Sequence, residues 1–161
     1  MNRTRRVLAA LTAAAALTSL SACLGPLAVD PTSTASSNAQ KQGDGALRTD
    51  LEPLTSRFPV LGQPVSAQWM SGTLGDSRLP GPSTYWIDAI VVVTPEVAAE
   101  LAPLASETGT PDLVAGVAEL VPPGTLRTSE QIDARFSTDT WWVDAYLVEG
   151  SDTVVLAARG D

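Results

Sequence analysis

Residues 85–93 read YWIDAIVVV, and this stretch is the strongest strand signal in the chain. Aromatic and β-branched side chains favour extended backbone, and consecutive side chains of a strand point to opposite faces of its sheet. Trp86, Asp88 and Ile90 therefore share one face, while Tyr85 belongs to the other. The pattern predicts a strand over residues 83–93.

A second stretch repeats this pattern 56 residues later, where residues 141–148 read WWVDAYLV. Eight residues are too few to separate an internal duplication from convergence on residues that favour strands, so both origins stay open. If the two strands are neighbours in a sheet, Trp86 and Asp88 lie beside Trp142 and Asp144 on one face.

The segments around these two strands carry helix and turn signals. A capping threonine followed by proline starts two of the expected helices. Strands that are joined by a short turn are antiparallel, so the sequence predicts an α+β domain. We expect roughly four strands in a mainly antiparallel sheet, with two or three helices packed on one face. The other expected elements are a helix over 50–58, a strand over 64–74, helices from Thr94 and Thr110, a helix over 128–136 and hairpin strands over 140–148 and 153–158.

Composition excludes several kinds of chemistry. The chain has 161 residues with no histidine, one cysteine and a net charge of −8. Without histidine there is no Ser-His-Asp or Cys-His nucleophile system and no histidine-ligated metal. Lys41, the one lysine, lies in a segment with linker composition, which disfavours a Ser-Lys pair. The acidic balance argues against a nucleic-acid partner, and the spacing of Asp and Glu predicts neither a metal nor a cofactor.

The first residues have the layout of an export signal. Three arginines in residues 1–6 precede an apolar stretch over 7–17, which is too short to span a bilayer. The quartet LSAC at residues 20–23 resembles the lipobox of bacterial lipoproteins. That resemblance implies cleavage after residue 22 and a diacylglyceryl thioether on Cys23. The alternative is an ordinary signal peptide with a chance cysteine.

Two acyl chains give stable attachment to a bilayer, so the lipobox implies a protein anchored through Cys23 on the extracytoplasmic face of the cell membrane. Residues 4–8 read TRRVL and partly resemble a twin-arginine signal, although Leu8 stands where that signal prefers phenylalanine. Both the general secretory route and the twin-arginine route therefore remain open.

Composition divides the chain into three parts. Residues 1–22 are the expected signal peptide. Residues 23–47 are the expected lipidated terminus and flexible linker, because residues 31–46 are small, polar and rich in Gly and Ser, with no hydrophobic period. Residues 48–161 form the expected globular domain. Loss of residues 1–22 removes three of the ten positive charges, so the net charge of the remaining chain is −11.

The two similar strands give a hypothesis for a ligand site. Trp86 and Trp142 would stack on a sugar or a flat apolar group, and Asp88 and Asp144 would accept hydrogen bonds from it. We expect a non-enzymatic module that binds a ligand or a protein of the cell envelope. One alternative is a small hydrolase of cell-wall or extracellular glycans that uses the two carboxylates. The other is a purely structural domain, in which the tryptophans pack and the aspartates pair with arginines such as Arg78, Arg127 or Arg135.

Three segments also resemble small lipoproteins of unknown function from actinobacteria such as the streptomycetes. They read PVSAQW at 64–69, SGTLG at 71–75 and PGPSTYWIDA at 80–89. The nine arginines to one lysine fit a GC-rich genome of that kind. The resemblance implies location at the cell envelope and no particular activity.

Overall fold

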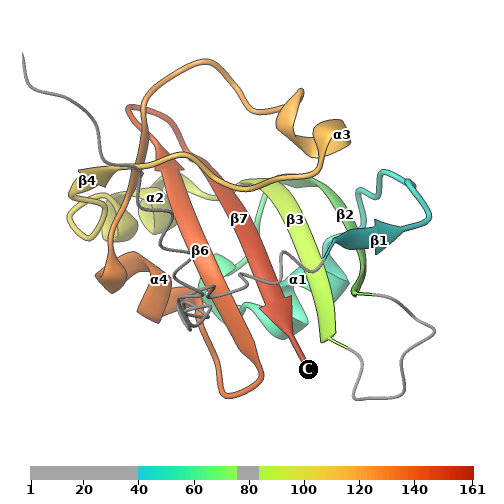
Figure 1. The fold of residues 1–161 in the computed structure, drawn as a ribbon. Helices are drawn as coiled ribbons and strands as arrows, with labels where there is room; N and C mark the ends of the chain where they lie inside the picture. The colour runs from blue at the N-terminus through green and yellow to red at the C-terminus, as the bar shows by residue number, and fades with distance from the viewer. Residues whose placement is uncertain (1–39, 76–83) are drawn as a thin grey trace, which may run out of the picture. The chain divides into compact units, whose positions relative to one another are not determined.

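The structure, a computed structural model, describes residues 40–75 and 84–161. These residues form one open antiparallel sheet of seven strands in the order β1-β2-β3-β7-β6-β5-β4 (Figure 1). The strands are β1 (Lys41–Gly43), β2 (Ser66–Leu74), β3 (Thr84–Val92), β4 (Glu107–Thr108), β5 (Leu126–Thr128), β6 (Trp141–Val148) and β7 (Thr153–Gly160). The helices are α1 (Glu52–Arg57), α2 (Pro95–Leu101), α3 (Ala115–Ala118) and α4 (Glu130–Phe136), with a 3₁₀ turn η1 (Pro59–Leu61).

The predicted α+β class is confirmed, whereas the expected number of four strands is wrong. The four long strands β2, β3, β6 and β7 are the four that the sequence predicted. The other three have only two or three residues each. Such short segments hold too few residues for an alternating pattern to show, and only their pairing with longer strands defines them.

Helices cover both faces of the sheet, so the expectation that they all lie on one face is wrong. We call the side with α1, α2 and α4 the helical face, where Leu54, Leu101 and Phe136 pack on the strands. On the opposite face Val117 of α3 packs against Ile90. The physical reason is that the central strands are apolar on both sides, and each side needs cover from water.

The two similar strands are not direct neighbours, because β7 lies between β3 and β6. Both pair with β7 in an antiparallel sense, and the repeated residues stand level with each other across it. All four predicted site residues therefore lie on the opposite face of the sheet. The aligned triplets are Trp86–Arg159–Trp142 and Asp88–Ala157–Asp144.

Strand β1 lies within the range 23–47 that composition assigned to the lipidated terminus and linker. Its three residues have no hydrophobic pattern, and contacts with the sheet hold them in place instead. A Cβ atom on Gly72 would overlap the carbonyl group of Gln42, and one on Gly43 would stand 3.0 Å from the Trp86 ring. Two glycines therefore let β1 lie close against β2 and β3 (Figure 1).

Candidate functional site

A groove of about 1090 Å³ lies on the helical face, where α1 and β1 meet the first residues of β3 and β6. Its aromatic lining residues are Trp69, Tyr85, Trp86 and Trp141, and we call it the aromatic groove. Arg48 and Arg57 line it as well. Tyr85 is 46% exposed, so its ring is open to a bound molecule. The groove thus combines flat apolar surface with charged groups, as small-molecule sites commonly do.

The position of Trp141 depends on a glycine in the neighbouring strand. Gly160 of β7 stands level with Tyr85 on one side and with Trp141 on the other. A Cβ atom at Gly160 would come within 2.5 Å of the Trp141 ring, so the ring lies over the bare backbone of β7. Phe58 supports the same ring edge to face, with centroids 5.8 Å apart.

The two arginines of the groove lie against its tryptophans. The Arg48 guanidinium is 5.1 Å from the centroid of the Trp69 ring, and that of Arg57 is 5.9 Å from the Trp141 ring. Arg48 donates to Ser71 Oγ and to the Asp44 carboxylate, each at 3.0 Å. These contacts hold Arg48 in place and partly neutralise its charge.

Arg57 differs from Arg48 in its charge partners. It donates to the Pro53 carbonyl at 2.7 Å, at the end of α1. In the part of the chain that the structure describes, no carboxylate forms an ion pair with it. Arg57 is therefore the positive charge that the groove offers to a ligand.

Two hydrogen bonds favour the charged form of the Asp44 carboxyl group. The Ala46 amide donates to it at 3.0 Å and, together with Arg48, lowers the pKa of the Asp44 carboxyl. The resulting ion pair orders the loop that follows β1, which forms one side of the groove.

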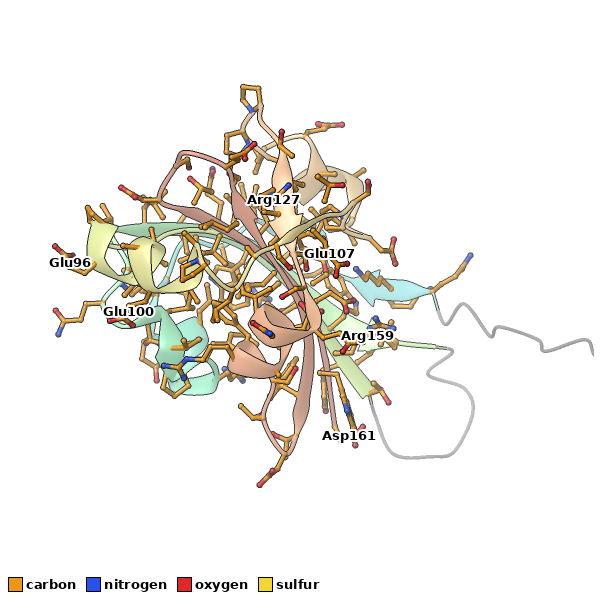
Figure 2. All side chains as sticks on the ribbon, turned by 90° about the vertical axis from the view of Figure 1, so that its left-hand side faces the viewer. Glu96, Glu100, Glu107, Arg127, Arg159 and Asp161 are labelled. Carbon is orange, nitrogen blue, oxygen red and sulfur yellow. The ribbon has the colours of Figure 1, made fainter. Side chains whose placement is uncertain are left out.

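The predicted Trp/Asp face is half covered. Trp86 is 2% exposed and Asp88 is fully buried, whereas Trp142 is 58% exposed. Asp144 is half exposed and accepts from Arg159 at 3.0 Å. Arg159 lies near the end of β7 (Figure 2). The structure brings the four residues onto one face, but only the half on β6 is open to solvent.

Asp88 is buried beneath β1 and the segment before α3. Lys41 Nζ donates to both of its carboxylate oxygens, at 2.8 and 2.9 Å, and the Val114 amide donates to one of them at 2.7 Å. Burial raises the pKa of the Asp88 carboxyl, although the Lys41 ammonium and the Val114 amide oppose that shift. The aspartates thus pair with Lys41 and Arg159, and among the described residues neither forms an ion pair with Arg127 or Arg135.

Sequence reasoning missed the aromatic groove, although its signal was present. Tyr85 and Trp141 are the first residues of the two similar strands, and alternation places them on the face opposite to Trp86 and Trp142. Arg57 and Lys41 had no local signal, because only the fold brings them to Trp141 and Asp88.

Cys23, the expected site of lipid attachment, and Arg78 lie outside the described residues. Within residues 40–75 and 84–161, no group of three or more His, Cys, Asp or Glu side chains could hold a metal ion. The described helices include none that is long and apolar enough to cross a membrane. Comparison of the chain with family models, with curated proteins and with solved structures found no match.

Proposed function

We propose that this chain is a lipid-anchored protein of the extracytoplasmic face of the cell membrane, related to the small actinobacterial lipoproteins that it resembles. Its α+β domain binds a ligand in the aromatic groove and performs no chemistry on it. The quartet at residues 20–23 supports the anchor. The groove supports the binding function.

The single observation that carries the binding function is the meeting of Tyr85, Trp141 and Arg57 in one groove. Aromatic rings favour the apolar face of a sugar ring, and a guanidinium donates to its oxygens or to a carboxylate. At the cell envelope a saccharide of the wall has this chemistry. The groove, which Trp86 also lines, therefore replaces the face shared by Trp86 and Trp142 as the proposed site. The proposed ligand is still a sugar.

Tyr85 and Trp142 are both exposed but lie on opposite faces of the sheet, so substitution of Trp142 is a matched control for substitution of Tyr85. The full chain is titrated with oligosaccharides of N-acetylglucosamine and N-acetylmuramic acid, and binding is followed by intrinsic tryptophan fluorescence. Tyr85→Ala should weaken binding by about 3- to 10-fold, since one aromatic contact contributes about 0.5–1.5 kcal/mol. Trp142→Ala should leave the affinity unchanged. If Trp142→Ala weakens binding and Tyr85→Ala does not, the site lies on the opposite face. If the unmodified chain binds none of these oligosaccharides, a saccharide ligand is contradicted.

The anchor is tested separately in cells. A clickable fatty-acid analogue should label the unmodified chain, and Cys23→Ser should lose the label and move to the soluble fraction. Ser19→Ala, which lies outside the quartet, is the matched control and should keep both label and membrane association. Label that persists in Cys23→Ser would show that Cys23 is not the acylated residue.

A further inference from the structure

Strand β1 forms one side of the aromatic groove. Gln42, Gly43 and Asp44 line the groove together with Tyr85 and Trp141. These three residues come between the expected lipid anchor and the rest of the domain in the sequence. The groove is therefore complete only when this short segment is docked on the sheet.

The contact that holds β1 lies outside the groove, on the opposite face. Lys41 Nζ binds both oxygens of Asp88 and also donates to the Asp112 carbonyl at 2.6 Å. Its side chain is 15% exposed and that of Asp88 is fully buried. Neither Lys41 nor Asp88 lines the groove.

Within the described residues, the other contacts of β1 are its pairing with β2 and its packing against Trp86. Three residues pair with β2, and the Trp86 indole N–H donates to the Gln42 carbonyl at 2.9 Å. A strand of three residues at a sheet edge has little stability of its own. The contacts of Lys41 therefore form a large part of what keeps β1 docked.

We propose that Lys41 and Asp88 form a clasp that regulates the aromatic groove, because docking of β1 completes the groove wall and ligand binding in turn holds β1 in place. This inference rests on the proposed function and names its regulation. Two events that favour the same state are linked, and each strengthens the other by the same factor. A force or partner that lifts the segment before Lys41 would release the ligand.

Removal of the Lys41 charge tests the clasp without touching the groove. In Lys41→Met the buried Asp88 carboxylate has no cation beside it, and an unpaired buried charge is unfavourable. Undocking of β1 lets water reach the carboxylate and removes this cost. Amide exchange of residues 41–44, measured by mass spectrometry on the full chain without ligand, should rise at least about tenfold. Arg159→Met is the matched control, because it removes the exposed cation from Asp144 at the aligned position. Unchanged exchange in Lys41→Met would overturn the clasp.

The second measurement is the affinity for the same N-acetylglucosamine and N-acetylmuramic acid oligosaccharides. Affinity falls in proportion to the fraction of molecules with β1 docked, so a Lys41→Met chain in which β1 is docked in about one molecule in ten should bind about tenfold more weakly, while Arg159→Met is unchanged. Saturating oligosaccharide should slow the exchange of residues 41–44 in the unmodified chain. Released β1 with unchanged affinity overturns the regulation and leaves the groove as a site. Absence of binding by the unmodified chain overturns both.

Gly72→Ala is a second variant that should undock β1, in this case through a steric clash. It is used if near-ultraviolet circular dichroism shows that Lys41→Met does not fold. Its methyl group would overlap the Gln42 carbonyl, so β1 cannot stay in place. The same pair of results is expected, namely faster exchange of residues 41–44 and weaker binding. Tight binding by a folded Gly72→Ala chain with β1 released contradicts the proposal.

Discussion

Asp88 holds its carboxylate at the centre of the sheet, with no exposed surface and with the single lysine of the chain beside it. Desolvation favours its neutral form, whereas Lys41 favours its charged form, and burial is the larger effect. The residue therefore connects the stability of the fold to pH.

Replacement of Asp88 by asparagine should change that pH dependence in a defined direction. The raised pKa of Asp88 means that the folded chain binds the proton more tightly than the unfolded chain does. The free energy of unfolding contributed by Asp88 therefore falls as the pH rises from 3.8 through the folded pKa, and is constant above it. Urea unfolding of the unmodified chain and of Asp88→Asn at a series of pH values isolates this contribution, and the free energy of unfolding of the unmodified chain minus that of Asp88→Asn should fall as the pH rises through this window. A difference that grows with pH would mean that the ion pair outweighs burial.

Two adjacent tryptophans at the start of β6 should differ sharply when each is shortened. Trp141 packs on Phe58 and over Gly160, so Trp141→Ala should lower the free energy of unfolding by about 3 kcal/mol. Trp142 is 58% exposed, and Trp142→Ala should stay within about 0.5 kcal/mol of the unmodified chain. Urea denaturation of both variants measures the difference. Equal losses would contradict the assignment of the two side chains to opposite faces.

At the scale of elements, α4 and the residues beside it protect the outer edge of β6. The Asp133 carboxylate accepts from the Ala145 amide at 2.7 Å, and Ser137 Oγ accepts from the Val143 amide at 3.0 Å. Thr128 Oγ1 donates to the Ala145 carbonyl at 2.8 Å. Side chains thus take the place of a neighbouring strand where β5 is too short to pair with the whole of β6.

Asp133→Ala should expose part of this edge. The Ala145 amide loses its acceptor, which should lower the free energy of unfolding by about 1–3 kcal/mol. The open edge should also raise the rate of aggregation, measured by light scattering near the unfolding midpoint. Asp139→Ala, an exposed aspartate in the loop before β6, serves as control and should behave like the unmodified chain. An equal effect of the two substitutions would rule out edge protection by Asp133.

Sequence patterns predicted those elements whose own residues define them. Alternation and β-branched residues located the four long strands, and threonine before proline located the start of α2. The same pair at Thr110 did not start a helix, because α3 begins only at Ala115. The short strands were missed because their pairing depends on residues far along the chain. For the same reason the ligand-site hypothesis took Trp86 and Asp88 to be open to a ligand, since nothing local shows that β1 covers them. The groove of Tyr85 and Trp141 required the position of α1, which local patterns do not give.

In the molecule as a whole, a stability measurement can decide whether residues 40–45 belong to the folded domain. Chains that begin at Gln40 and at Ala46 differ by β1 and its contacts with Asp88. The shorter chain should be less stable by up to about 3 kcal/mol, because it leaves a buried carboxylate without its cation. Urea unfolding of the two chains gives this difference. Equal stability would mean that β1 adds nothing to the domain and would assign residues 40–45 to the linker.

The position of β7 in the sheet also determines how the chain reaches its folded state. This strand follows the other six described strands in the sequence, yet it occupies the middle of the sheet between β3 and β6. The two halves of the sheet cannot join until Thr153–Gly160 is available, so the decisive contacts form late and between distant residues. A topology of this kind folds in milliseconds to seconds rather than microseconds. In a chain that emerges from its N-terminus, the sheet therefore cannot close until Thr153–Gly160 has emerged.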